Sequence, residues 1–477
     1  MSLDTRAQAA RILGSFDRKE IASIIKVLLA GFLAWGVAWV PNSLGWGWYE
    51  GLSAAGRVSL GIMLFAALLW MSEAIPAFAV ALLVIGLQIL LLGRPGGVMT
   101  AEGDTSAWLM FVEPWASGIM WLFLGGFVMA HACTKTQLDR WLAGLLLGRL
   151  AGRPGWLVLG VMGVTFVFSM FMSNTATAAM MVAVTAPVLA GLPEASKFAR
   201  GLMVAIAVGA NLGGMGTIIG TPPNAIAAGQ LSGEHAVNFL AWMGMTLPPA
   251  LVFAGLSFGV IWWFWVRGED ASGVEMDLEL DDGPSLVRKR FIVMVVFAVT
   301  VALWMGGGLF GIPAAVVSFI PIIVLAMTGV MSSEDIRELP WDVLILLAGG
   351  LSLGVGVKET GLAEWLVGQV PTTLAPVGLA LVFTLVGLAL SNLMSNTAAA
   401  AILIPLGVSL VGPEHVKLVA ISIAMGCSGA MCLPISTPPN AIVYSSGRLA
   451  ARDFLIPGVC LTIMVPFAVF WLAAIGV

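Results

Sequence analysis

The chain has 477 residues, of which 59% are hydrophobic and only 10% charged, with a mean hydropathy of +1.00. Soluble domains carry about 25% charged residues, so this composition excludes a water-facing globular surface. The net charge of −4 says little about partners. The cysteines show neither metal spacing nor a disulfide framework, and we interpret them as small buried hydrophobic residues, at Cys133, Cys427, Cys432 and Cys460.

A basic tail, residues 1–20, precedes the first apolar run and contains Arg6, Arg11, Arg18 and Lys19. The run itself, 21–40, is too long for the apolar region of a signal peptide, and no small-residue cleavage site follows it. We therefore interpret it as an uncleaved first span of a bacterial inner-membrane protein.

Apolar runs of about membrane-spanning length recur along the rest of the chain. They predict an all-α polytopic membrane protein with about 11 spans and two re-entrant hairpins. The hairpins are expected near 156–192 and 372–410. The spans are expected near 21–40, 57–74, 76–93, 117–148, 199–228, 240–267, 290–311, 313–330, 341–358, 417–445 and 453–477.

The chain contains an internal repeat, which is the first feature to seek in any sequence. MSNTATAA at Met172 returns as MSNTAAAA at Met394, 222 residues later, and TPPNAI at Thr221 returns at Thr437, 216 residues later. FLGG at Phe123 is echoed by LAGG at Leu347. Ordered blocks at nearly one offset indicate two copies of one unit.

These blocks divide the chain into segments. An odd number of spans between the copies gives them opposite orientations, which is the inverted-repeat plan of secondary transporters. The segments are the tail 1–20, the spans 21–114, the first repeat 115–267, a polar linker 268–289, the spans 290–339 and the second repeat 340–477.

The distribution of basic residues predicts the orientation. With the N-terminus inside, 18 Lys and Arg residues lie on the cytoplasmic side and four lie outside, at Arg57, Arg94, Lys358 and Lys417. This asymmetry follows the positive-inside rule. With an odd number of spans, the C-terminus is then expected outside, and the linker is expected to be cytoplasmic.

The SNT blocks place three polar residues in the middle of apolar segments, at Ser173, Asn174 and Thr175 in the first copy. Ser, Asn and Thr favour helix caps over helix interiors. We expect a helix break at a hairpin tip, with Thr or Asn capping the second arm. Such a break must line a protein cavity, because lipid satisfies no backbone group. A polar kink is the alternative, and the duplication argues against it.

The TPPN blocks follow glycine-rich segments and contain two consecutive prolines. Proline interrupts a helix interior but suits the first helical position, with Thr before it as N-cap. Each block is therefore expected to end one half-helix and begin another. A simple proline kink is the alternative.

Together, the four breaks are expected to expose four helix N-termini whose free N–H groups converge on an anion. No Lys or Arg occurs near the motifs, so Asn, Thr, backbone amides and helix dipoles would form the anion site. Unwound carbonyls and the Ser and Asn oxygens suit Na⁺.

Two ionisable residues are weaker candidates. Glu73, before Ala74, Ile75 and Pro76, is interpreted first as part of a helix-end turn, and His131 as a packing histidine with its hydrogen bonds satisfied rather than a proton relay. They are also the candidates for an intramembrane enzyme, and neither repeats. The duplicated site favours transport over catalysis, so no enzyme activity is expected.

The paired SNT and TPPN blocks resemble the divalent anion/sodium symporter family, dicarboxylate and citrate transporter type. Ser169 and Ser391, four residues before each SNT block, and the segment around Glu73 share this resemblance, which covers about residues 20–477. The stretch 433–443 resembles the family's C-terminal signature. Met431, where the family often has Phe, departs from the pattern.

The resemblance implies a homodimer with scaffold spans and a mobile transport domain, moving small divalent anions by an elevator-type alternating-access mechanism. It implies substrate contacts at Asn174, Thr175, Thr221, Asn396, Thr397, Thr437 and Pro438. One Na⁺ would be bound by Ser169, Ser173, Asn174 and Gly220. A second would be bound by Ser391, Ser395, Asn396 and Ser436.

The expected function is secondary active transport of a C4-dicarboxylate, such as succinate or malate, or of citrate, coupled to Na⁺. A Na⁺-independent dicarboxylate exchanger and a sulfate transporter are the alternatives within the same family.

Overall fold

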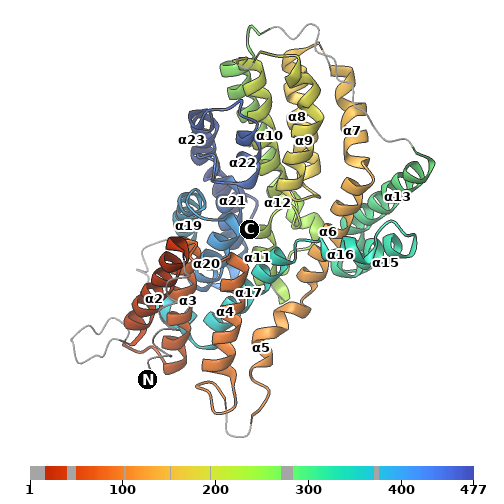
Figure 1. Ribbon diagram of the computed structural model, residues 1–477. Helices are drawn as coiled ribbons and strands as arrows, with labels where there is room; N and C mark the ends of the chain where they lie inside the picture. The colour runs from red at the N-terminus through yellow and green to blue at the C-terminus, as the bar shows by residue number, and fades with distance from the viewer. Residues whose placement is uncertain are drawn as a thin grey trace, which may run out of the picture.

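The protein is described from a computed structural model over residues 17–39, 50–100, 104–150, 152–193, 195–231, 233–269, 283–369 and 375–477. Every regular element within these ranges is helical, which confirms the all-α prediction (Figure 1). Arg6, Arg11 and most of the polar linker lie outside the described residues.

The N-terminal helices are α2 (Arg18–Trp39), α3 (Ala54–Ser72) and α4 (Ala77–Gln88), the last continued by the π-helix Ile89–Gly93. Helix α3 ends at Glu73, whose backbone is left-handed at φ 47°, and α4 begins directly after Pro76. The segment from Glu73 to Pro76 is therefore the helix-end turn that its proline suggested.

The predicted span 117–148 is divided, which corrects that prediction. After α5 (Leu109–Val112) and the 3₁₀ turn Glu113–Ala116, helix α6 (Gly118–Lys135) is separated from α7 (Leu138–Leu147). Gln137 between them is left-handed, at φ 56°. The hydroxyl of Thr136 also donates to the Ala132 carbonyl, 2.7 Å away, where the first helix ends.

Two helix pairs occupy the predicted hairpins. They are α8 (Pro154–Ser169) with α9 (Asn174–Ala190), and α19 (Pro376–Ser391) with α20 (Asn396–Ser409). Their lengths of 16, 17, 16 and 14 residues correspond to about 21–26 Å at 1.5 Å per residue. This is less than the hydrocarbon thickness of about 30 Å, as expected for segments that turn back inside a membrane.

Two helices are interrupted at the TPPN blocks. Helix α10 (Lys197–Met215) is followed by α11 (Pro222–Gln230), and α21 (Val416–Gly429) by α22 (Pro438–Ser445). In both cases the second half-helix begins at the first proline. These interruptions extend over several residues, so the prediction of unwound segments is right and that of simple proline kinks is wrong.

The remaining helices connect or surround these units. The span predicted at 453–477 is divided into two helices, which are separated by Val465 and Pro466. The elements are α12 (Phe239–Ile261) with the π-helix Trp262–Val266, α13 (Pro284–Gly306), α14 (Ala314–Val317), α15 (Phe319–Met327), α16 (Ser333–Arg337), α17 (Trp341–Glu359), α18 (Leu362–Gln369), α23 (Leu455–Met464) and α24 (Phe467–Ala474). In the part of the chain described, seven helical segments are long and apolar enough to cross a membrane. The count of about 11 spans stays a prediction.

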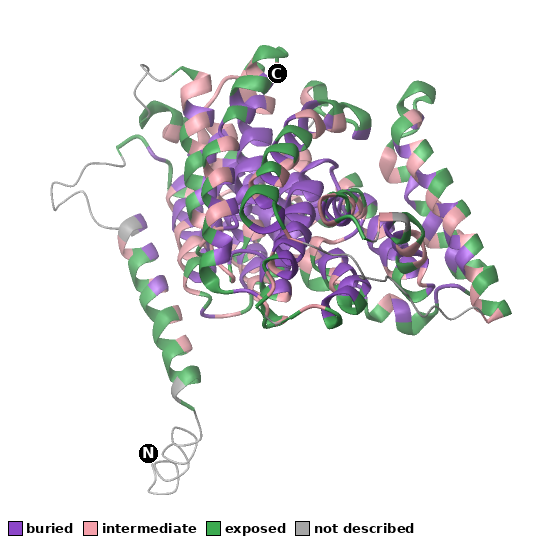
Figure 2. Ribbon diagram, turned by 90° about the horizontal axis from the view of Figure 1, so that it is seen from above, coloured by how far each residue is buried: buried purple, intermediate pink, exposed green. Residues whose placement is uncertain are grey.

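The core lies where the two repeats interlock. Helix α22 of the second repeat packs against α9 and α10 of the first, and α11 of the first packs against α20 and α21 of the second. Glycines permit the closest approaches: a Cβ on Gly213 would lie 2.2 Å from the Phe166 carbonyl of α8. Figure 2 shows this centre as buried, with exposed residues at the periphery. Each half thereby brings its motif to the middle of the molecule.

Candidate functional site

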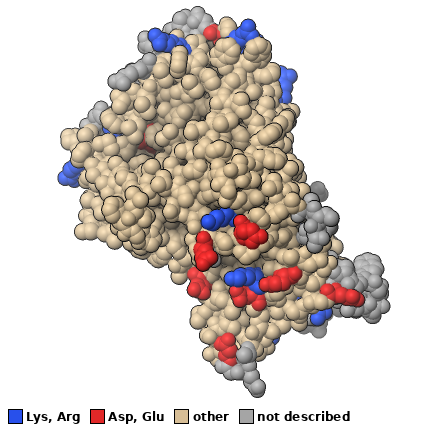
Figure 3. Space-filling model, turned by 180° about the vertical axis from the view of Figure 1, so that it is seen from behind, with Lys and Arg blue, Asp and Glu red and all other residues tan. Residues whose placement is uncertain are grey.

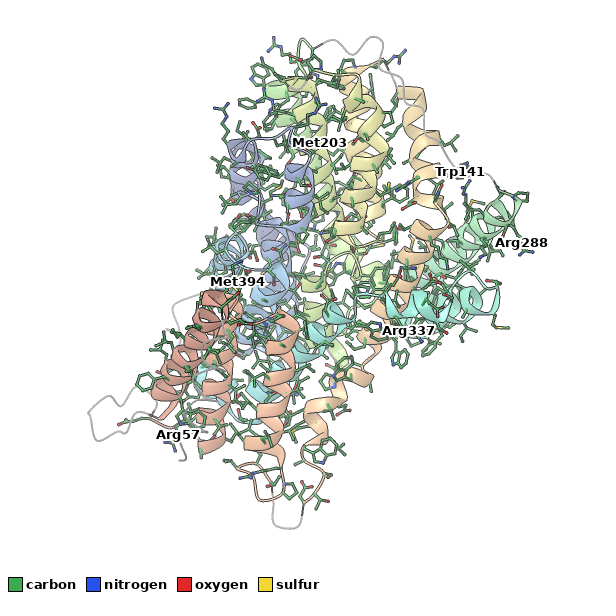
Figure 4. The ribbon with its side chains drawn as sticks, in the orientation of Figure 1. Arg57, Trp141, Met203, Arg288, Arg337 and Met394 are labelled. Carbon is green, nitrogen blue, oxygen red and sulfur yellow. The ribbon has the colours of Figure 1, made fainter. Side chains whose placement is uncertain are left out.

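A cavity of about 820 Å³ lies between the two hairpin tips and the two unwound segments. Met394, labelled in Figure 4, marks the second tip near the middle of the molecule. The cavity brings together all seven predicted substrate residues and most of the predicted Na⁺ residues. Those lining it are Ser173, Asn174, Thr175, Gly220, Thr221, Ser395, Asn396, Thr397, Ser436, Thr437 and Pro438.

Serine caps each hairpin tip. Ser173 Oγ accepts the Ala176 N–H and Ser395 Oγ accepts the Ala398 N–H, both at 3.2 Å. The expectation that Thr or Asn provides this cap is therefore wrong, because the cap precedes the first helical residue and that position belongs to Ser. The first two amides of each helix have no partner within the helix, so Asn and Thr at each tip retain free N–H groups.

The TPPN breaks offer fewer donors than expected. Pro438 and Pro439 occupy the first two positions of α22 and have no N–H. The third amide, of Asn440, donates to Thr437 Oγ1 at 3.3 Å. In α11, Pro222 and Pro223 likewise have no N–H, and the Asn224 amide donates to the Thr221 carbonyl at 3.1 Å. The prediction of four helix ends with free N–H groups is therefore wrong at both breaks. Hydroxyl groups remain the available donors there.

Thr437 is oriented by the other repeat. Its Oγ1 accepts from Asn211 Nδ2 of α10 at 3.1 Å as well as from the Asn440 amide. A hydroxyl group has two acceptor sites and one donor. Both acceptor sites are thus used, and the hydroxyl proton of Thr437 is left to donate toward a ligand in the cavity.

The asparagine of each TPPN block holds its unwound segment in place. Asn224 Nδ2 donates to the Gly214 and Thr217 carbonyls at 2.9 and 2.8 Å. Asn440 Nδ2 donates to the Met431 and Leu433 carbonyls at 3.1 and 2.9 Å. These side chains replace hydrogen bonds that the interrupted helices lost. Their duplication was visible in the sequence, although their role was not.

The first predicted Na⁺ site is partly closed by internal hydrogen bonds. Ser169 Oγ lies 2.6 Å from both Asn174 Oδ1 and the Ala210 carbonyl. Ser169 is fully buried and lies behind the cavity wall. A Cβ on Gly214 would lie 2.6 Å from Asn174 Oδ1, so glycine is required beside this asparagine.

The second predicted Na⁺ site differs from the first. Ser391 Oγ and Asn396 Oδ1 are both buried, and neither has an oxygen or nitrogen partner among the described residues. The Ser436 hydroxyl group donates to Oδ1 of Asn392, the residue after Ser391, at 2.8 Å. Buried oxygens without donors are costly unless something compensates them, and a hard cation such as Na⁺ does so.

Sequence reasoning missed Asn211 and Asn392. Asn211 is a buried polar residue within a helix that is otherwise almost wholly apolar, which is the signal that identifies it. Asn392 Oδ1 accepts the Cys432 N–H at 2.8 Å, and the aligned position of the first repeat holds Met170. Because neither residue repeats, a search by duplication passes over both.

The cavity contains two acidic residues, Glu73 and Asp342, and no Lys or Arg among the described residues that line it. Both carboxylates are exposed. A bound dianion therefore meets no cationic side chain in the cavity wall.

His131 lies outside the cavity lining. Its Nε2 is 3.2 Å from Asp335 Oδ1, and Lys135 Nζ is 2.5 Å from Asp335 Oδ2. Burial raises the pKa of Asp335, but hydrogen bonds from Lys135, Ser332 and His131 outweigh it and hold the pKa well below its usual range. His131 thus has the polar partner expected of a packing histidine.

Comparisons with known proteins agree with these features. A family model described as citrate transporter matches residues 67–426. The chain belongs to the divalent anion/sodium symporter family. This family member is a multi-pass membrane transporter and not an enzyme.

Relatives match over most of their length. A sodium-dependent dicarboxylate transporter SdcS of Staphylococcus saprophyticus is 31% identical, over 86% of this chain and 84% of the relative. The SdcS of Staphylococcus aureus is 30% identical, over 84% of this chain and 82% of the relative.

Solved structures share the fold. The YdaH transporter of Alcanivorax borkumensis superposes with a TM-score of 0.53 at 14% identity, over 86% of this chain and 97% of that one. The MtrF efflux pump of Neisseria gonorrhoeae superposes with a TM-score of 0.53 at 13% identity, over 84% of this chain and 94% of that one. Both are transporters, and at such identities the likeness concerns the fold.

Proposed function

We propose that the chain is a Na⁺-coupled symporter of C4-dicarboxylates such as succinate or malate, with citrate as the larger candidate. The observation that carries this proposal is the pair of SNT tips facing one cavity between two repeats. Each tip supplies two free amides and a threonine hydroxyl. Two carboxylates of one substrate match two such tips, and the sodium-dependent dicarboxylate relatives support the same substrate class.

The charges of the cavity support coupling to a cation. A dicarboxylate adds two negative charges to a cavity that already contains Glu73 and Asp342 and, among its described residues, no Lys or Arg. Uncompensated charge at membrane depth is expensive. Co-bound Na⁺ supplies the compensation, which gives the substrate and the ion a reason to bind together.

The proposed Na⁺ ligands come from both repeats. The first set is Ser169, Ser173, Asn174 and the Gly220 carbonyl, and the second is Ser391, Ser395, Asn396 and the Ser436 carbonyl. The unpartnered oxygens of Ser391 and Asn396 favour the second set. In the first set, Ser169 and Asn174 bond to each other, so Na⁺ binding there requires the Ser169 hydroxyl to turn.

The proposal extends to the membrane arrangement that the resemblance implies. The transporter is a homodimer in the bacterial inner membrane, with a cytoplasmic N-terminus, and it moves its substrate by an elevator motion. Packing of α22 on α9 and of α11 on α20 supports movement of the four motifs as one body.

Uptake by proteoliposomes tests the function. Radiolabelled succinate is offered with an inward Na⁺ gradient or with choline, and unlabelled succinate, malate, citrate, 2-oxoglutarate or sulfate is added as a competitor. We expect Na⁺-dependent uptake that malate and succinate inhibit and sulfate does not. Equal uptake in choline, stimulated by internal dicarboxylate, would instead establish the exchanger. Competition by sulfate alone would establish a sulfate transporter.

A further inference from the structure

A second pocket, of about 390 Å³, lies apart from the central cavity, where α10 and α23 begin. Three cationic side chains and one carboxylate line it, with two aromatic rings beside them: Lys197, Arg200, Arg452, Asp453, Phe264 and Trp265. Figure 3 shows Lys and Arg side chains at the upper end of a molecule whose visible face is largely uncharged, and α8, α9 and α10 reach this end in Figure 1.

The positive charge of this pocket is mostly uncompensated. Asp453 Oδ2 accepts the Ala450 N–H at 2.8 Å, so this carboxylate caps the turn that precedes α23. Its Oδ1 is 3.8 Å from Arg200 Nη1. The Arg200 Nε–H is buried and has no partner in the described part of the chain. With three cations and one acid, the lining has an excess of two positive charges.

The position of two of these cations favours an anionic ligand. Lys197 and Arg200 lie in the first turn of α10, a helix of 19 residues with no acid in that turn. Cations at a helix N-terminus are disfavoured by the helix dipole, whereas anions are favoured there. An anion in the pocket would offset both the dipole and the excess charge.

The surroundings indicate that the anion belongs to a lipid. Phe264 is 52% exposed and Leu455, which also lines the pocket, is 46% exposed. Next to them, Trp263 is 60% exposed and Arg267 lies over its ring, 4.6 Å from the centroid. Exposed aromatic residues beside cations are typical of a membrane interface. The charged pocket therefore borders an apolar surface suited to acyl chains.

We propose that this pocket binds the phosphate group of an anionic phospholipid such as phosphatidylglycerol. Lys197, Arg200 and Arg452 contact the phosphate, and the acyl chains lie along Phe264 and Leu455. Basic pockets between helices on the cytoplasmic side bind anionic headgroups in this way. The site is independent of the proposed transport substrate.

Native mass spectrometry of the purified full-length protein tests the proposal. Phosphatidylglycerol and phosphatidylcholine of equal chain length are titrated against the wild type, Lys197→Gln, Arg452→Gln and the double variant. We expect the wild type to bind phosphatidylglycerol more tightly than phosphatidylcholine. Each substitution weakens binding about fivefold, and the double variant roughly 25-fold, at about 1 kcal/mol per cation. Arg153→Gln removes an exposed cation just before α8 and is expected to leave binding unchanged.

Two further results decide the source of the anion. Inorganic phosphate at millimolar concentration is expected to neither compete with phosphatidylglycerol nor raise the thermal stability of the protein. Equal binding of the two lipids, or an Arg153 variant as weak as the Lys197 variant, would overturn the proposal. Stabilisation by inorganic phosphate that the double variant abolishes would assign the pocket to a free phosphate and overturn the lipid assignment.

Discussion

The hydroxyl groups that line the cavity differ in how many hydrogen bonds they already make within the protein. Ser173 and Ser395 accept a helix amide each, and Thr437 accepts two donors. Thr175 and Thr397 line the cavity at the second position of their helices, after the cap. Substitution of these two threonines therefore tests binding with the smallest change to the fold.

Thr175→Ala and Thr397→Ala are each expected to weaken dicarboxylate binding by roughly 10- to 150-fold. Each removes a donor to a charged group, worth on the order of 1.5–3 kcal/mol, and leaves the Ser cap in place. Equilibrium binding of labelled succinate to purified protein measures the effect. His131→Gln serves as control, because its ring faces Asp335, and a larger loss there than at both threonines would contradict the site.

Ser391→Ala is expected to change thermal stability little without Na⁺, because its buried hydroxyl has no oxygen or nitrogen partner among the described residues and faces the Cys427 thiol, a weak hydrogen-bonding group. The Na⁺ concentration for half-maximal uptake is expected to rise on the order of tenfold, which corresponds to about 1.4 kcal/mol. Ser422→Ala is the matched control, because its buried hydroxyl also has no partner in the described part of the chain. Equal Na⁺ dependence of the two variants would remove Ser391 from the Na⁺ site.

At the scale of the element, the two interrupted helices depend on side chains to replace lost backbone bonds. Prolines prevent the second half-helix from continuing the first. The side-chain amide of the asparagine, three residues after the threonine, donates to the carbonyls of the unwound segment. The TPPN asparagines thus stabilise the shape of the break, while the threonines contact the cavity.

Asn440→Ala is expected to lower the free energy of unfolding by about 3 kcal/mol, because it removes three hydrogen bonds of about 1 kcal/mol each. Asn440 Nδ2 donates to the Met431 and Leu433 carbonyls, and Asn440 Oδ1 accepts from Asn211 Nδ2. Uptake is expected to fall below detection, since Thr437 loses its position with the break. Thermal unfolding and uptake are measured together. Asn238→Ala is the control, because it removes only an exposed cap of α12. It is expected to lower the free energy of unfolding by about 1 kcal/mol and to leave uptake unchanged. Normal uptake by the Asn440 variant would refute the role of the break.

At the scale of the whole molecule, the interlocking of the repeats explains why one cavity contains residues from both halves. Asn211 in the first repeat orients Thr437 in the second across 226 residues of sequence. Arg448, after α22, donates to the Leu189 and Pro193 carbonyls at the end of α9, both at 2.9 Å. The second broken helix is thus bonded to the first repeat at both ends, to α10 through Thr437 and to the end of α9 through Arg448.

A cysteine introduced at Val477 is expected to react with an impermeant maleimide on intact cells. The positive-inside asymmetry predicts a cytoplasmic N-terminus, and the predicted odd number of spans then predicts a C-terminus outside. Cys432 and Cys460, the partly exposed native thiols, are first replaced by alanine. Labelling that needs cell lysis would place the C-terminus inside and reverse the orientation.

The sequence by itself determined the helical class, the hairpins, the interrupted helices and the residues that meet in the cavity. These properties follow from local chemistry: the length of an apolar run, the geometry of proline and the capping preference of Ser, Thr and Asn. Duplication of the motifs added the symmetry that brings both tips to one place.

Only the tertiary structure decided which polar atoms are free to bind. Ser169 bonds to Asn174, whereas Ser391 has no oxygen or nitrogen partner in the described part of the chain and faces the Cys427 thiol, although both precede the same motif. The break at Gln137 is unmarked by proline or glycine, and beside it Lys135 bonds to Asp335, 200 residues away. These hydrogen-bond partners are determined by packing between elements that are distant in the chain, so the local sequence pattern around each residue does not predict them.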